Sequence, residues 1–276
     1  MEINCSGVSY FVEVSGKGEP LLLLHGFTGD HTTWSHLADS LKDNYLCIMP
    51  DLIGHGKSES PHDFLRYDLK KAAADLKHML ETLNIRSCHV LGYSMGGRLG
   101  LQFSVLFPEY VKTLMLESAS PGLLQSEERE QRKMQDLQLA DRIEREGMAA
   151  FVEYWQSIPL FKTQEKLSVE KKAAIYEQRL RNNEVGLANS LRGMGTGAQR
   201  SLWDELVNIQ FPVLLLTGEY DEKFCKIAKK MSAMLQNCEW QIICEVGHAI
   251  HVEDSEMFGR IVSGFIENRK EREYGN

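Results

Sequence analysis

The segment Gly92-Tyr93-Ser94-Met95-Gly96 has residue types and a spacing that suit nucleophilic chemistry. An apolar run at residues 88–92 leads into the serine, and a segment rich in small residues, 97–107, follows it. A Gly-x-Ser-x-Gly motif between a buried strand and a helix places its serine on a sharp turn, where the flanking glycines avoid steric clashes. The start of the helix also favours developing negative charge. We therefore predict that Ser94 is the catalytic serine.

A catalytic serine needs a histidine as its proton acceptor and a carboxylate that orients the histidine. Asp221 follows an apolar run at residues 213–216, and His248 follows another at residues 240–244. Serine, acid and histidine in this chain order, each in the loop after a strand, are typical of the α/β-hydrolase fold. The sequence thus predicts a Ser94–Asp221–His248 triad.

Neighbouring residues offer alternatives for two members of this triad. Glu219 and Glu222 flank Asp221, and His251 lies shortly after His248. Glutamates and histidines in loops are mostly surface groups. The positions directly after the strands therefore favour Asp221 and His248.

Two backbone N–H groups are expected to stabilise a developing oxyanion. One belongs to Met95, directly after the serine, and the other to Phe27 in His25-Gly26-Phe27, which follows an apolar run. The glycine-rich segment 51–58 lacks the spacing of a phosphate-binding loop, and we interpret it as one wall of the site. His55 within it is interpreted as structural, because a triad needs no second base.

Short apolar runs and helical patterns alternate along most of the chain. Strands are predicted at residues 8–14, 21–24, 45–49, 88–92, 111–116, 213–216 and 240–244, and helices at 68–83, 97–107, 223–235 and 256–266. This alternation indicates a mostly parallel central sheet flanked by helices. The polar, helical stretch 122–210 is expected to be a cap inserted after the sixth strand of the fold, over the strand ends. The core would then comprise residues 1–121 and 211–276, in one structural domain.

The composition narrows the possible partners and the compartment. A net charge of -8 argues against nucleic acid as a partner, because phosphate binding needs a basic surface. Six scattered cysteines, no signal peptide and no apolar run long enough for a membrane span indicate a cytoplasmic protein. The sequence has no metal-site spacing and no dinucleotide fingerprint, so we predict neither a metal nor another cofactor.

Arg98 lies in the first turn of the helix that follows Ser94. The helix dipole disfavours a cation at this place. Arg98 is therefore expected either to pair with a nearby carboxylate or to meet an anionic ligand, and the sequence leaves both possibilities open.

Several longer motifs resemble one family, the 2-succinyl-6-hydroxy-2,4-cyclohexadiene-1-carboxylate synthases of bacterial menaquinone biosynthesis, nearly end to end. The most specific are Gly92-Tyr93-Ser94-Met95-Gly96-Gly97-Arg98, Pro121-Gly122-Leu123, Leu180-Arg181-Asn182-Asn183, Gly218-Glu219-Tyr220-Asp221-Glu222-Lys223-Phe224 and Gly247-His248-Ala249-Ile250-His251.

The resemblance implies a small substrate that carries several carboxylates, which guanidinium groups bind well. Arg129 is an alternative to Arg132, and Tyr154 is an alternative to Trp155. The assignments of Arg132 and Trp155 rest on counting through a variable segment. The substrate-binding residues that the resemblance implies are Tyr93, Arg98, Arg132, Trp155 and Arg181.

The implied reaction is an elimination. A proton next to a ketone is removed and pyruvate leaves 2-succinyl-5-enolpyruvyl-6-hydroxy-3-cyclohexene-1-carboxylate, with Ser94 as the base. A serine hydrolase of small esters, thioesters or carbon–carbon bonds is the alternative, since the same triad serves acyl transfer. A non-catalytic receptor on the same fold is a third possibility, which an intact triad disfavours.

Overall fold

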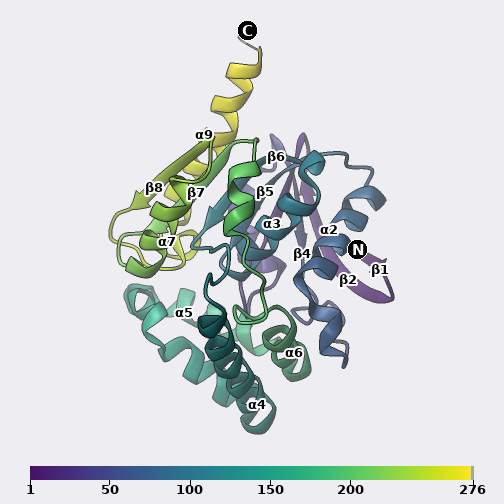
Figure 1. Ribbon diagram of the computed structural model, residues 1–276, viewed down its shortest axis with the longest axis vertical. Helices are drawn as coiled ribbons and strands as arrows, with labels where there is room; N and C mark the ends of the chain where they lie inside the picture. The colour runs from purple at the N-terminus through teal and green to yellow at the C-terminus, as the bar shows by residue number, and fades with distance from the viewer. Residues whose placement is uncertain (275–276) are drawn as a thin grey trace.

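The apolar runs of the chain form a twisted sheet whose strands are ordered β1-β2-β4-β3-β5-β6-β7-β8 in the computed structural model (Figure 1). The structure describes the backbone of residues 1–274 and the side chains of residues 1–269. β2 is antiparallel to β1 and β4, and the other neighbours are parallel. The strands are β1 (Glu2–Cys5), β2 (Val8–Gly16), β3 (Glu19–Leu24), β4 (Tyr45–Pro50), β5 (Cys88–Tyr93), β6 (Val111–Glu117), β7 (Val213–Gly218) and β8 (Cys238–Ile243).

Helices cover both faces of this sheet, as strands buried on both sides require. In β3, Leu22 and Leu24 pack into one apolar cluster, while Leu21 and Leu23 pack into the other. The first cluster includes side chains of α2 (Leu69–Thr82), α3 (Met95–Leu106) and α7 (Glu222–Ser232). The second includes side chains of α1 (Ser35–Leu41), α8 (Ile250–Glu253) and α9 (Ser255–Tyr274).

The helical cap lies between β6 and β7 in the sequence. It contains α4 (Ser126–Ser157), the 3₁₀ helix η4 (Pro159–Lys166), α5 (Val169–Leu180) and α6 (Glu184–Met194), and α4 to α6 gather at one end of the sheet (Figure 1). Its own apolar cluster joins α4 to α6. Within the stretch 122–210, however, Leu202 and the 3₁₀ helix η5 (Trp203–Asn208) pack into a cluster of the sheet core.

Most predicted elements coincide with observed ones to within a few residues, but several short elements, β1 and α1 among them, were not predicted. β1 has four residues and forms a hairpin with β2. α1 has seven residues and buries Leu37, Ala38 and Leu41. Neither segment is long enough to display a clear hydrophobic period. None of the helices in the described part of the chain is long and apolar enough to cross a membrane.

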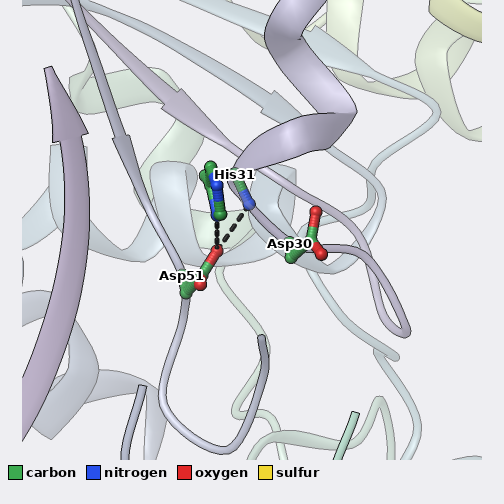
Figure 2. A group of neighbouring side chains, drawn as sticks. All are labelled: Asp30, His31 and Asp51. Atoms are coloured by element: carbon green, nitrogen blue, oxygen red, sulfur yellow. Dashed lines mark hydrogen bonds and ion pairs between the residues drawn. The ribbon is translucent and has the colours of Figure 1, made fainter. Parts of the chain in front are cut away.

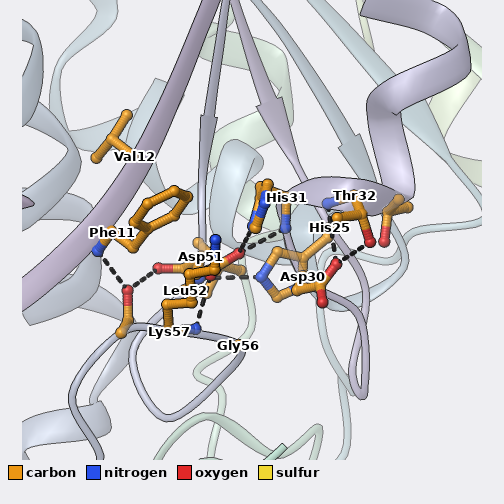
Figure 3. A network of polar contacts seen from close by, with 12 residues as sticks. Phe11, Val12, His25, Asp30, His31, Thr32, Asp51, Leu52, Gly56 and Lys57 are labelled. Atoms are coloured by element: carbon orange, nitrogen blue, oxygen red, sulfur yellow. Dashed lines mark hydrogen bonds and ion pairs between the residues drawn. The ribbon is translucent and has the colours of Figure 1, made fainter. Parts of the chain in front are cut away.

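A polar network holds the two loops that follow β3 and β4. The Asp51 carboxylate accepts a hydrogen bond from the backbone N–H of His31 and contacts His31 Nδ1 at 2.8 Å (Figure 2). Its other oxygen accepts from the Lys57 N–H (Figure 3). His25 Nε2 accepts a hydrogen bond from the Leu52 N–H at 2.9 Å (Figure 3), and its Nδ1 donates to the Gly26 carbonyl. His25 must therefore stay neutral to fix the Gly26 loop.

His55 lies in the same region, and its ring centroid is 5.2 Å from that of His25. Its Nδ1 donates to the Ile53 carbonyl, whereas its buried Nε2 has no hydrogen-bond partner among the described residues. Burial lowers the pKa of His55 to about 3 and also lowers the pKa of His25 below its ordinary value. Both side chains are thus held uncharged at neutral pH, and His55 packs edge-on against the Phe27 ring.

Acid should destabilise the fold through these histidines. An unfolded histidine binds its proton near pH 6.5, whereas folded His55 does so only near pH 3, so the unfolded state binds more protons between these values. Stability is therefore lost as the pH falls below about 6.5, by roughly 2 kcal/mol at about pH 5 for His55 alone. Urea unfolding of the wild type at about pH 7.5 and about pH 5 measures this loss.

The His55→Asn variant should show a smaller loss between the two pH values, because it keeps a donor for the Ile53 carbonyl but cannot titrate. His78→Asn, at an exposed position on α2, serves as the matched control and should lose as much as the wild type. An equal loss in His55→Asn and the wild type would contradict the assignment of this acid sensitivity to His55.

Candidate active site

Ser94 joins β5 to α3 in a backbone conformation with φ of 50° and ψ of -105°. The two glycines of its motif are required by close backbone contacts. A Cβ on Gly92 would lie 2.5 Å from the Gly96 carbonyl oxygen, and a Cβ on Gly96 would lie 2.1 Å from that of Leu24. The Ser94 N–H donates to the carbonyl of Glu117 on the neighbouring strand β6 at 2.8 Å. This serine is therefore held firmly at the end of the sheet.

The structure brings the three predicted catalytic side chains together. His248 Nε2 lies 3.1 Å from Ser94 Oγ, and His248 Nδ1 lies 2.6 Å from Asp221 Oδ2. The side chains of His248 and Asp221 are buried, so their contact is shielded from water. The loops after β7 and β8 approach so closely that a Cβ on Gly218 would lie 2.1 Å from the Gly247 carbonyl oxygen.

The side chains that were alternatives to Asp221 and His248 contact other residues. The Glu219 carboxylate accepts a hydrogen bond from the backbone N–H of Glu245. Glu222 is exposed and forms an ion pair with Lys226 on the same helix. His251 Nδ1 contacts both carboxylate oxygens of the buried Glu117, at 2.8 and 2.9 Å. The geometry thus singles out Asp221 and His248 as the partners of Ser94.

The expected oxyanion donors flank the same cavity as Ser94. Phe27 comes from the loop after β3, and Met95 is the first residue of α3. The first N–H groups of a helix have no intrahelical acceptor. The Met95 N–H therefore remains available to an oxygen next to Ser94.

A cavity of about 280 Å³ lies between the cap and the sheet core, with Ser94 and His248 in its wall. Much of the rest of the wall is aromatic or aliphatic. Its charged residues are unbalanced, with four basic side chains against one carboxylate. The basic residues are Arg98, Arg132, Lys223 and Lys230, and the acidic one is Glu128.

Arg98 is buried, and its guanidinium has only neutral partners. Nη1 donates to the Met194 carbonyl at 2.8 Å and to the Gln199 side-chain oxygen at 3.0 Å. Burial lowers its pKa to about 10, with the charge of Arg132 acting in the same direction, so Arg98 stays protonated at neutral pH. Because no carboxylate contacts it directly within the described residues, the geometry favours the anionic-ligand alternative for this cation.

The structure separates the two candidate arginines of the cap. Arg132 lines the cavity, and its Nε donates to the buried Asp136 at 2.7 Å. Asp136 also accepts from the Gly197 N–H, which ties this arginine to the loop after α6. Arg129 instead donates to the carbonyls of the nearby loop before α4. Arg132 is therefore the cap arginine that can reach a ligand.

The aromatic candidates are separated in the same way. Trp155 lines the cavity, and its buried Nε1–H has no acceptor among the described residues, whereas Tyr154 is exposed and stacks under Arg142. Tyr93 also lines the cavity, with its ring 5.4 Å from that of His248. Trp155 and Tyr93 are thus the aromatic candidates that line the cavity.

The predicted Arg181 does not reach the cavity. Its side chain is 52% exposed and forms an ion pair with Asp30 at 2.9 Å. Arg179, in the last turn of α5, is buried at 6% exposure and lines a second cavity of about 210 Å³. This second cavity shares Phe27, Tyr93 and Phe161 with the first.

Arg179 was missed because the asparagine-containing motif draws attention to Arg181. Its guanidinium lies 4.8 Å from the centre of the Phe161 ring, and no carboxylate lies within ion-pair distance among the described residues. Because α5 ends at Leu180, the motif at residues 180–183 lies at and past the end of the helix and shows no hydrophobic period that would mark Arg179 as facing inward.

Lys223 was also missed, although it lies within a recognised motif, two residues after Asp221. Lys223 lines both the cavity beside Ser94 and an open hollow that Asp221 and His248 also line. Burial lowers its pKa, and the charge of Arg132 acts in the same direction. Lys223 therefore adds a further cation beside the catalytic residues.

One group of side chains in the described residues lies close enough to share a metal ion, namely Asp30, His31 and Asp51 (Figure 2). Each carboxylate already accepts several hydrogen bonds from the protein. Asp30 accepts from Thr32, Gln178 and Arg181, and Asp51 accepts from His31 and Lys57. These contacts explain the cluster as a structural link between loops and the cap.

Comparisons with known proteins agree with this geometry. The family described as the alpha/beta hydrolase fold matches residues 19–255. A Bacillus subtilis (strain 168) protein with the provisional name 2-succinyl-6-hydroxy-2,4-cyclohexadiene-1-carboxylate synthase is 45% identical over 262 residues, which are 94% of this chain and 95% of that protein. The synthase of that name from Klebsiella pneumoniae subsp. pneumoniae is 31% identical over 88% of this chain and 92% of its own length.

A solved structure supports the same relationship. MenH from S. aureus superimposes with a TM-score of 0.90 and 35% sequence identity, covering 95% of this chain and 98% of its own. The chain thus belongs to the 2-succinyl-6-hydroxy-2,4-cyclohexadiene-1-carboxylate synthase family, within the α/β-hydrolase fold.

Proposed function

We propose that this enzyme removes pyruvate from 2-succinyl-5-enolpyruvyl-6-hydroxy-3-cyclohexene-1-carboxylate and yields 2-succinyl-6-hydroxy-2,4-cyclohexadiene-1-carboxylate. The observation that carries the proposal is the buried Arg98, a cation with no carboxylate partner among the described side chains, in the cavity that Ser94 and His248 also line. An anionic substrate would compensate this charge. The names of the related proteins support the same reaction.

In the proposed mechanism, His248 takes the Ser94 proton and Ser94 removes the proton from the carbon next to the substrate ketone. The electron pair of that C–H bond moves into an enolate, whose oxygen accepts from the Phe27 and Met95 N–H groups. The enolate then re-forms the ketone as a C2=C3 bond forms, the existing C3=C4 bond moves to C4=C5, and the C5–O bond to the enolpyruvyl group breaks. The leaving group takes up a proton and becomes pyruvate. Asp221 holds the His248 ring and stabilises its cation.

The basic residues of the site would hold the carboxylates of the substrate. Arg98 and Arg132 line the catalytic cavity, and Lys223 lies beside His248. Arg179 takes the place that Arg181 was expected to fill, because it is buried and no anionic side chain within residues 1–269 pairs with it. Bidentate guanidinium contacts fix both position and orientation, and such positioning lowers a barrier by several kcal/mol.

A serine hydrolase is the alternative function, because the same three catalytic side chains perform acyl transfer. The cations of the cavity disfavour a neutral ester, which would leave them uncompensated in an apolar wall. A cytoplasmic location and a small polycarboxylate as the binding partner follow from the proposed reaction, as does independence from any metal or cofactor.

Pyruvate release from the enolpyruvyl substrate tests the reaction directly. The Ser94→Ala variant should lower kcat/KM by at least roughly 10³-fold, because it lacks the base. The wild type is also assayed on p-nitrophenyl esters with neutral and anionic acyl groups. It should turn over these esters poorly. Near-normal pyruvate release by Ser94→Ala would contradict the mechanism, and brisk ester cleavage without pyruvate would favour the hydrolase.

Two arginines on the same segment give a matched test of the carboxylate contacts. Arg179→Gln should lower kcat/KM for pyruvate release roughly tenfold to a hundredfold, since a charge-assisted hydrogen bond contributes about 1.5–3 kcal/mol. Arg181→Gln, at the exposed position, should stay within about twofold of the wild type. A larger loss of kcat/KM in Arg181→Gln than in Arg179→Gln would assign the carboxylate contact to Arg181.

A further inference from the structure

A second histidine–carboxylate pair, Glu117 and His251, lies behind the catalytic residues. Glu117 ends β6, and its side chain is completely buried. His251 belongs to the short helix α8, which begins directly after the His248 loop. A buried carboxylate is costly unless its oxygens are hydrogen-bonded. We therefore expect the buried Glu117–His251 pair to have a specific role.

Glu117 contacts both of the segments that carry the reacting side chains. Its backbone carbonyl accepts from the Ser94 N–H at 2.8 Å. Its carboxylate accepts from the backbone N–H of His251 at 3.1 Å and contacts His251 Nδ1 with both oxygens. One residue thus links the turn of the catalytic serine to the loop of the catalytic histidine.

The aromatic groups around the pair extend this link to the cavity wall. The Tyr93 ring lies 4.6 Å from that of His251 and 5.4 Å from that of His248, so it is held between the two histidines. Burial, followed by the negative charge of Glu117, raises the pKa of Tyr93 well above its ordinary value. On its far side, His251 packs against Trp34 and Phe258 of the core.

The His248 loop has a second carboxylate contact, from Glu253 on α8, which accepts from the Gly247 N–H at 2.9 Å. This contact fixes the loop to its own helix, and Glu253 also accepts from the cap residue Thr163. Of these two residues, Glu117 is the one that connects the sheet to α8, through its carboxylate, and to Ser94, through its backbone carbonyl.

We infer that Glu117 is a positioning residue that sets the distance between Ser94 Oγ and His248 Nε2 through its bonds to His251. The inference rests on the proposed catalytic roles of Ser94 and His248. Without the carboxylate, α8 and the loop before it lose their attachment to β6, and His248 shifts relative to the serine. A shift of about 1 Å can cost roughly a hundredfold in rate.

The test compares Glu117→Met, which keeps the size of the side chain but removes both bonds, with Glu117→Gln, which keeps an acceptor for the His251 N–H. For pyruvate release, Glu117→Met should lower kcat roughly tenfold to a hundredfold with KM within about threefold, because the cations of the cavity are untouched. Glu117→Gln should recover most of the lost kcat.

The rate at which a fluorophosphonate modifies Ser94 is measured on the same variants. This rate reports the serine–histidine pair without the lyase substrate, so it tests the inference even if the proposed reaction fails. It should fall in parallel with kcat in Glu117→Met. Asp75→Leu is the matched control, because Asp75 is an equally buried carboxylate, bonded to Tyr10 and Arg66. It should lose thermal stability but keep both rates.

Unchanged kcat and unchanged modification rates in folded Glu117→Met would overturn the inference, as would losses no larger than those of Asp75→Leu. If Glu117→Met does not fold, His251→Leu decides, because it removes the ring contact and leaves the backbone N–H bond in place. A fall of more than about threefold in both rates, with KM retained, is then expected. Rates equal to those of the wild type would reject the positioning role.

Discussion

The left-handed backbone of Ser94 is the constraint on which the rest of the site depends. A non-glycine residue adopts such a conformation only where its surroundings determine it strongly. Here β5 leads into the turn, α3 leads out of it, and Gly92 and Gly96 allow the backbones of Leu24 and α3 to pack against it. Because β3, β5, β7 and β8 run parallel, the loops after them reach the same sheet edge. Asp221 and His248 can therefore meet the half-buried Ser94 at this edge.

Charge is the second organising feature, and its distribution is uneven. The whole chain carries a net charge of -8, yet the catalytic cavity has four basic side chains and a single carboxylate in its wall. Arg98 is bonded to neutral oxygens, whereas Arg132 shares its charge with Asp136. A buried cation with neutral partners leaves a favourable place for an anion in a region of low polarity. The apolar wall around these residues strengthens that attraction.

The proximity of Ser94, Asp221 and His248 follows from sequence information that is local and ordered. An apolar run, a turn and a helix define the place of Ser94, and the loops after two later runs define Asp221 and His248. The cap is harder to predict in detail. Arg179 and Arg181 differ in whether the helix turns them inward or outward, which depends on tertiary packing that a short motif does not encode. The end of the cap is similarly ambiguous, because η5 is polar at the surface but buries Trp203 and Leu206 in the core.

The same reasoning explains how one catalytic arrangement can support an elimination or a hydrolysis. The serine, histidine and aspartate determine only that a proton can move away from an oxygen in a preorganised site. They do not determine whether that oxygen attacks a carbonyl carbon or removes a proton from the carbon beside it. That choice depends on which substrate atom lies next to Ser94 Oγ, and hence on where the carboxylates are bound. Arg98 comes from the core and Arg132 from the cap, so a substrate bound by both arginines, as we propose, contacts both parts at once. Under the proposed function, specificity therefore depends on the placement of these cations more than on the triad.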